Sequence, residues 1–138
     1  MVGKYLSEVK EIYFDSLGDD RGQLVALEQH KSIPFDIKRV YYMIHTLADV
    51  KRGLHAHKQL EQVAICLTGS CTINVESLAG KQGFTLADPH DGLYMGGLVW
   101  RELSDFSEDC VVVVIASELY SEDDYIRDYN EFLKYAKT

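Results

Sequence analysis

Two histidines separated by one residue, His55 and His57, are the side chains of this sequence best suited to chemistry. Successive side chains of a β-strand point to opposite faces, so a strand through this segment would place both imidazoles on one face. Histidine transfers protons near neutral pH and is also the commonest metal ligand. Basic residues flank the pair at Arg52 and Lys58. The segment therefore combines proton-transfer chemistry with the binding of an anion.

A metal site is the main alternative reading of this pair. Glu61 follows in the spacing His-x-His-x3-Glu, which is half of a metal-site pattern that a histidine on a later strand would complete. The later segment 96–102 has Arg101 at that point, and a guanidinium cannot ligate a metal. We therefore expect no metal and no other cofactor. Glu61 alternates with Val63 along the next strand, and we expect its carboxylate to orient a histidine.

The segment 37–45 carries a second set of candidate residues. Its alternation puts Arg39, Tyr41 and Met43 on one face of a strand. A guanidinium beside a phenol can line a polar cavity, with Arg39 on a phosphate and Tyr41 as a proton donor. The alternative is a solvated outer face, and the paired histidines favour the cavity. Because both faces carry large residues, one of them lacks an obvious partner within one subunit, which predicts a dimer.

The composition limits the class of protein. The chain has 138 residues, 46% of them apolar, which is enough for one domain, residues 1–138, with a sizeable core. The formal net charge of −8 argues against binding to nucleic acid or to an anionic membrane. Three cysteines without CxxC spacing indicate buried thiols in a reducing compartment. Neither a signal peptide nor a membrane-spanning run is visible, so we expect a cytoplasmic protein.

Short β-rich runs separated by turn residues predict an all-β fold. We expect strands at 11–14, 23–28, 37–45, 54–57, 62–67, 71–75, 83–86, 93–95 and 110–117, with a further strand in 96–102. The chain closes on a helix expected over 122–135, with Ser121 as its N-cap. This order predicts an antiparallel jelly roll, a two-sheet sandwich or small barrel, with a C-terminal helix.

Several motifs together resemble the nucleotide-sugar 3,4-ketoisomerases of the cupin superfamily. They are RGLHAHK and LEQV, with IKRVYYM before them, GSC after them, GLYMGGLVW further on and DYIRDYNEF near the end. The likeness runs from about residue 20 to residue 135. A shorter likeness, DDRG together with RGLH, extends to the dTDP-sugar 3,5-epimerases, in which the RGLH histidine is the base.

The resemblance implies a cupin-type jelly roll, metal-free catalysis and dTDP-4-keto-6-deoxy-D-glucose as substrate. It also implies a homodimer, for which exchange of N-terminal strands is one arrangement. Moving the ketone from C4 to C3 through an enediol(ate) needs a carbon base, acid/base groups at the oxygens and cations for the oxyanion. By the RGLH match His55 is the carbon acid/base. The other implied roles are His57 and Tyr41 as its partners, Arg39 and Arg52 on the diphosphate, and Arg21 and Arg101 on the sugar or phosphate.

Three alternative functions stay open. A 3,5-epimerase would exchange protons at C3 and C5 without moving the ketone, a metal-dependent dioxygenase would bind iron, and a non-catalytic sensor would bind a sugar nucleotide without turnover. Arg21 also reads as part of a surface turn. The resemblance implies that the positions of Arg21 and Arg101 bear on the configuration at C4, and their combination here leaves the galacto or gluco product open.

Overall fold

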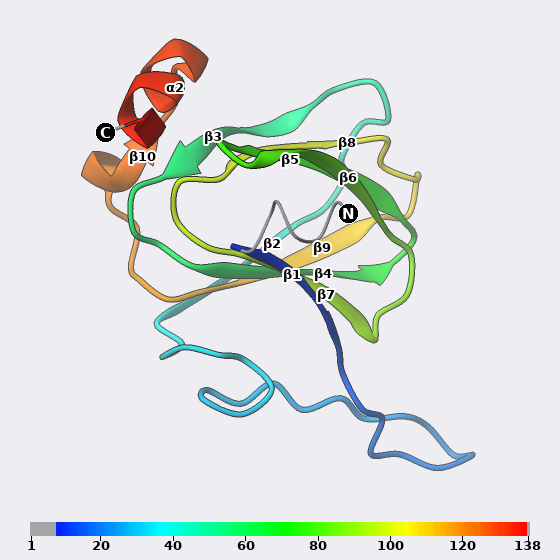
Figure 1. Ribbon diagram of the computed structural model, residues 1–138. Helices are drawn as coiled ribbons and strands as arrows, with labels where there is room; N and C mark the ends of the chain where they lie inside the picture. Colours follow the sequence, from blue (N-terminus) through cyan, green and yellow to red (C-terminus); the bar gives the residue numbers. More distant parts are fainter. Residues whose placement is uncertain (1–7, 138) are drawn as a thin grey trace.

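Two stacked antiparallel sheets form the body of the protein in the computed structural model, which describes residues 8–137 (Figure 1). The strand order is β1-β7-β4-β9-β2 in one sheet and β10-β3-β8-β5-β6 in the other. The elements are β1 (Val9–Tyr13), β2 (Arg39–Met43), β3 (Arg52–His57), β4 (Gln62–Thr68), β5 (Cys71–Ser77), β6 (Gly80–Leu86), β7 (Asp91–Met95), β8 (Trp100–Ser104), β9 (Val111–Ala116), the 3-10 turn η1 (Glu122–Asp124), β10 (Tyr125–Ile126) and α2 (Tyr129–Lys137). The all-β sandwich with a C-terminal helix that the sequence predicts is confirmed.

Alternation along β4 divides its side chains between two hydrophobic clusters. Ala64 and Cys66 face the space between the sheets, where they join the main core. Val63 and Ile65 face outward and form a second cluster on the outer side of the sheet. Alternation in the sequence therefore predicts correctly which side chains share a face of the strand. Which of the two faces meets the other sheet is settled only by the tertiary fold.

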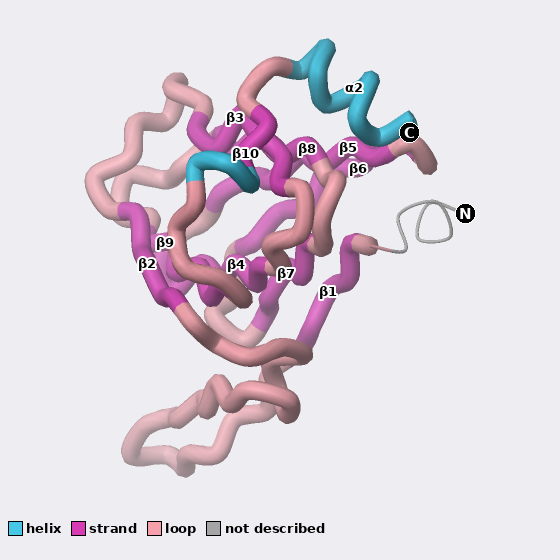
Figure 2. The backbone as a smooth tube through the Cα atoms, turned by 90° about the vertical axis from the view of Figure 1, so that its left-hand side faces the viewer, coloured by secondary structure: helices cyan, strands magenta, loops and turns pink. Residues whose placement is uncertain are grey.

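The long segment between β1 and β2 covers this outer cluster. It lies beyond the outer face of its sheet, in two views at right angles (Figures 1 and 2). Ile33 and Phe35 are buried on the outer cluster, and Val25 and Leu27 pack against it. The strand expected at 23–28 does not form; the apolar side chains of this segment pack on the sheet as an irregular loop instead.

The C-terminal region departs most clearly from expectation. The helix expected over 122–135 is split into η1, the short strand β10 and α2. Ser121 precedes η1 without a side-chain capping hydrogen bond, and α2 is capped instead by Asp128, whose Oδ1 accepts from the backbone N–H of Glu131 at 3.1 Å. The apolar spacing of Tyr125, Ile126 and later residues fits a helix locally, but pairing of β10 with β3 prevails.

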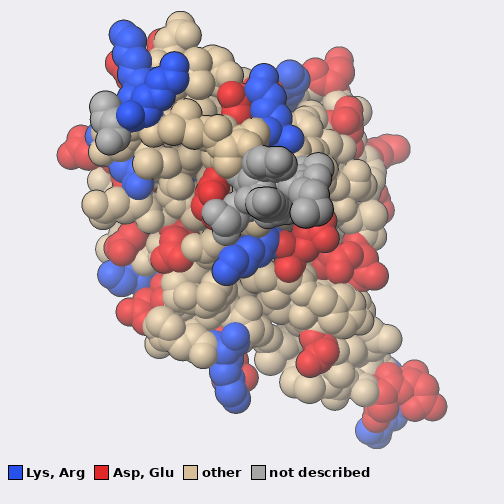
Figure 3. Space-filling model, viewed as in Figure 1, with Lys and Arg blue, Asp and Glu red and all other residues tan. Residues whose placement is uncertain are grey.

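The surface matches the acidic composition of the chain. On the face shown in Figure 3, acidic and basic side chains are interspersed, with no continuous basic stripe. Among residues 8–137 no helix has both the length and the apolar character needed to cross a membrane.

Candidate active site

A cavity of about 500 Å³ lies between the sheets, with walls from β2, β3, β8 and β10. Its polar lining is rich in cations and phenols, and its floor is formed by apolar residues of the core. The polar side chains are Arg39, Tyr41, Tyr42, Lys51, Arg52, His55, Gln62, Arg101, Tyr125 and Arg127. The volume suits a small-molecule ligand, and the excess of guanidinium groups suits an anionic one.

A bulge in β3 brings Arg52 and His55 to the same cavity. Three residues apart on a regular strand, they would point to opposite faces. The register against β8 shifts between the two pairs Arg52↔Leu103 and His55↔Arg101, so β3 contains one extra residue here. Gly53 lies in the shift with a φ of +89°, a value that favours glycine. The Arg-Gly step of the RGLH motif therefore serves to aim both side chains.

The two histidines form a chain with an aspartate. His55 Nε2 lies 3.1 Å from His57 Nε2, and His57 Nδ1 lies 3.1 Å from Asp124 Oδ2. His55 lines the cavity, whereas His57 is fully buried behind it and does not. The ring of Tyr125 lies against both imidazoles, with centroid distances of 5.0 Å and 4.4 Å.

A second chain of hydrogen bonds leads from Arg101 to Tyr41. Arg101 is 1% exposed and donates to Gln62 Oε1 and, at 3.0 Å, to the carbonyl of Val99. Because a guanidinium only donates, the Gln62 oxygen must face Arg101 and its amide nitrogen must face Tyr41, to which it donates at 3.0 Å. Tyr41 therefore accepts from Gln62, and its own O–H remains available to an oxygen of a ligand.

Burial and the guanidinium of Arg101 keep both imidazoles neutral. Desolvation, followed by the charge of Arg101, lowers the pKa of His55 to about 2 and that of His57 to about 3. Desolvation also lowers the pKa of Arg101 to about 10, which still leaves it cationic at neutral pH. Burial raises the pKa of Tyr41, so its phenol stays protonated. The site thus offers neutral bases, a phenolic acid and a buried cation.

The structure gathers most, but not all, of the predicted site residues. Those that line the cavity are Arg39, Tyr41, Arg52, His55 and Arg101, and His57 contacts His55 from behind. Lys58 lies outside the cavity, with its ammonium 5.5 Å from the ring centre of Tyr135. Arg21 lies on an exposed loop, where it forms an ion pair of 2.6 Å with Asp19.

The expectation for Glu61 needs correction. Its carboxylate accepts a hydrogen bond of 2.5 Å from Tyr94, on the outer side of the sheet with Val63 and Ile65. Alternation was predicted correctly, but this face is not the cavity face, and the adjacent Gln62 occupies the cavity instead. The carboxylate that contacts a histidine is that of Asp124.

Sequence reasoning missed several residues of the site. Lys51 and Arg127 add cations to the cavity, and Gln62 and Tyr125 add polar groups to its wall. The alternation of side chains along residues 62–67 was the signal that could have placed Gln62 on the cavity face. Asp124 is the first residue of the DYIRDYNEF motif, but its contact with His57 arises only through the pairing of β10 with β3.

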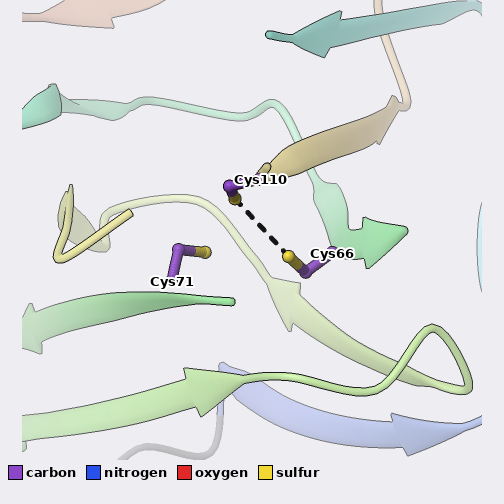
Figure 4. Close-up of side chains that lie close together, drawn as sticks. All are labelled: Cys66, Cys71 and Cys110. Atoms are coloured by element: carbon purple, nitrogen blue, oxygen red, sulfur yellow. Dashed lines mark hydrogen bonds between the residues drawn. The ribbon is translucent and has the colours of Figure 1, made fainter. Parts of the chain in front are cut away.

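Three cysteines form a group whose ligand atoms could converge on a metal ion. The sulfur atoms of Cys66, Cys71 and Cys110 lie within 4.8 Å of one another inside the main core, and those of Cys66 and Cys110 are 3.5 Å apart (Figure 4). Burial raises the pKa of Cys66 to about 12 and also raises that of Cys71. Protonated, buried thiols in an apolar environment act as core packing, as the sequence indicates.

Comparison with known proteins connects this cavity to an enzyme family. A relative from Aneurinibacillus thermoaerophilus, a TDP-4-oxo-6-deoxy-alpha-D-glucose-3,4-oxoisomerase, is 52% identical over 93% of this chain and 92% of its own. A mutant of the 3,4-ketoisomerase QdtA from Thermoanaerobacterium thermosaccharolyticum, solved with TDP-4-keto-6-deoxyglucose, is 47% identical, with a TM-score of 0.92 over 96% of both chains. The TDP-quinovose 3,4-ketoisomerase WlaRB from Campylobacter jejuni is 44% identical, with a TM-score of 0.88 over 91% of this chain and 97% of its own.

A family model gives the same result over almost the whole chain. The model described as "FdtA: WxcM-like, C-terminal" matches residues 7–137, a range that includes every residue of the cavity. This protein therefore belongs to the FdtA, WxcM-like C-terminal family.

Proposed function

We propose that the protein is a 3,4-ketoisomerase that converts a TDP-linked 4-keto-6-deoxyglucose to a 3-keto-6-deoxyhexose. The observation that carries this proposal is the cavity, which brings together a neutral imidazole, a phenol with an available proton and a buried guanidinium. These are the groups that keto migration through an enediolate requires. The activities named for the relatives agree with it.

His55 transfers protons at the carbon atoms of the substrate, and Tyr41 transfers protons at its oxygen atoms. His55 takes the C3 proton, and the electron pair of that C–H bond enters the enediolate. The imidazolium exchanges this proton with solvent and then protonates C4. Tyr41 gives its proton to the C4 oxygen and recovers one from the C3 hydroxyl, so that all protons balance. The buried cation of Arg101 stabilises the negative charge on the intermediate.

Cations at the cavity mouth hold the diphosphate. Arg39 and Arg52 line the cavity together with Lys51 and Arg127. The Nε atom of Arg39 is buried and has no hydrogen-bond partner among the described residues, so an anion would satisfy it. The guanidinium of Arg39 is held over the Tyr41 ring at 5.0 Å. A fork held in this way suits phosphate oxygens better than a flexible ammonium does.

Incubation with dTDP-4-keto-6-deoxyglucose in D2O, followed by NMR, tests the function. We expect a 3-keto product with deuterium at C4 and exchange at C3. Exchange at C3 and C5 without ketone migration would favour an epimerase, and binding without turnover would favour a sensor. We propose that catalysis needs no metal, so activity lost on chelation and restored by Fe, Mn or Zn would contradict that mechanism.

We propose in addition that the enzyme is a cytoplasmic homodimer. Strand β2 lies at the edge of its sheet, and Val40 and Tyr42 of this strand and Ile44, which directly follows it, are 56%, 65% and 48% exposed. An edge strand with an exposed apolar row favours pairing with a second copy. Arg21 is a candidate to reach the partner's cavity in such a dimer, since it lies away from the cavity of its own chain.

A further inference from the structure

The buried histidine His57 links the cavity histidine to the carboxylate of Asp124. Its two ring nitrogens have one partner each, His55 Nε2 at 3.1 Å and Asp124 Oδ2 at 3.1 Å. The imidazole is fully buried, so solvent competes for neither contact. A ring held at both nitrogens in this way has a defined orientation and a defined tautomer.

The positions of the ring protons follow from the hydrogen-bond roles. A carboxylate only accepts, so His57 carries its proton on Nδ1 and its Nε2 is an acceptor. The partner of that acceptor, His55 Nε2, must then carry a proton. In neutral His55 the remaining nitrogen, Nδ1, has a lone pair, and no hydrogen bond occupies it among residues 8–137. The tautomer of His55, the base that faces the cavity, is therefore set by a carboxylate that lies two hydrogen bonds away.

The C-terminal segment fixes Asp124 firmly in this place. Its backbone carbonyl accepts from the N–H of Lys58 at 2.9 Å. Its Oδ1 accepts from the N–H of Gln59 at 2.9 Å, and its Oδ2 accepts from the N–H of Leu60 at 3.3 Å. The following residues pair as β10 with β3, in the register Tyr125↔His57. Both oxygens of the carboxylate are thus oriented by the turn that follows the histidine strand.

We propose that Asp124 is a positioning residue that sets the tautomers of His57 and His55, so that His55 presents an unprotonated nitrogen to the substrate. This inference rests on the proposed ketoisomerase function. When His55 takes the carbon proton, its Nε2–H already points at His57 Nε2, so the positive charge is stabilised along the chain toward Asp124. With the opposite tautomer, His55 would present an N–H to the substrate and could not accept the proton.

Replacement of the carboxylate by an amide tests the inference with little change in shape. In Asp124→Asn the side-chain NH2 can donate to His57 Nδ1, which reverses both tautomers. We expect kcat to fall by about a hundredfold to ten-thousandfold, with KM changed by less than about threefold. The same change in the serine-protease triad lowers kcat about 10⁴-fold because the tautomer is wrong. Asp124→Glu, which keeps the acceptor, should recover part of the lost kcat.

The matched control is Asp123→Asn, which makes the same change one residue earlier, at an exposed position. We expect wild-type kcat and KM for this variant. Wild-type kcat in Asp124→Asn would overturn the inference. So would a large rise in KM with kcat unchanged, since that result would assign Asp124 to substrate binding.

A spectroscopic readout keeps the test independent of turnover and of the variant's folding. NMR of ¹⁵N-histidine-labelled wild-type protein without substrate should show His57 protonated on Nδ1 and His55 protonated on Nε2. Protonation of His57 on Nε2 would overturn the inference. If these tautomers are found but the wild-type protein does not turn over the sugar nucleotide, the proposed function fails and the arrangement set by Asp124 stands.

Discussion

At the scale of single residues, the site works through groups that can play only one hydrogen-bond role. A guanidinium donates and a carboxylate accepts, and these two facts orient Gln62 and His57 respectively. Each then fixes the group that faces the cavity, Tyr41 as an acid and His55 as a base. Gln62 and His57 thus decide which hydrogen-bond roles Tyr41 and His55 can offer to the cavity.

His55 should be the residue that moves the carbon-bound proton. His55→Asn keeps some hydrogen bonding but removes the base, so we expect kcat to fall about a hundredfold or more. Exchange of the substrate C3 proton with D2O, followed by NMR, should stop as well. The control is His30→Asn, on an exposed loop remote from the cavity lining. Full C3 exchange in His55→Asn with none in His57→Asn would reverse the assignment.

At the scale of elements, the C-terminal segment connects a packed helix to the active site. Phe132 of α2 is fully buried against Trp100 of β8, and the two ring centres are 5.8 Å apart. Ile126 of β10 belongs to the same cluster, two residues after Asp124. The helix therefore anchors the strand that delivers Asp124 to His57.

Removing this anchor should destabilise the fold measurably. Phe132→Ala deletes a buried aromatic ring and leaves a cavity beside Trp100, which typically costs about 3–5 kcal/mol. Urea unfolding followed by circular dichroism would measure the loss. Asn130→Ala, at an exposed position of the same helix, serves as the control and should change stability by about 0.5 kcal/mol or less. A similar midpoint for both variants would show that α2 contributes little to the core.

Local sequence patterns predict most of the strands correctly. Most strands and the shared cavity face of Arg39 and Tyr41 follow from alternation alone. Alternation cannot say which face of a strand meets the other sheet, and so it favoured Glu61 over Gln62. Nor can it find β10, since two residues gain strand geometry only from a partner that is about seventy positions away in the chain.

At the scale of the whole molecule, two neutral buried histidines make stability depend on pH. Their pKa values are lowered to about 2 and about 3 in the folded state, while an unfolded histidine titrates near 6.5. Between about pH 6.5 and pH 3 the unfolded chain therefore binds protons that the folded chain does not. The free energy of unfolding contributed by these groups is complete above about pH 6.5 and falls as the pH is lowered through this window.

Denaturant unfolding at several pH values should show this dependence. Near pH 5 the two histidines together contribute a slope equivalent to nearly two protons. His57→Asn removes one of them, so the slope should fall by about one proton, whereas His30→Asn, whose histidine is exposed, is the comparison. An unchanged slope in His57→Asn would mean that this imidazole is not held neutral in the folded protein.

The exposed apolar side chains on the edge strand β2 predict that two chains assemble into a dimer. Val40, more than half exposed, lies on the edge strand whose inner face carries Arg39 and Tyr41, so an interface there would also hold the cavity wall in place. We expect light scattering to report a dimer at micromolar concentration. Val40→Lys would place an unpaired charge in the interface and should shift the protein toward monomer. Leu78→Lys, at an exposed apolar position in the turn between β5 and β6, should leave the dimer intact. A wild-type monomer would leave the apolar row on β2 without a partner and remove the inference.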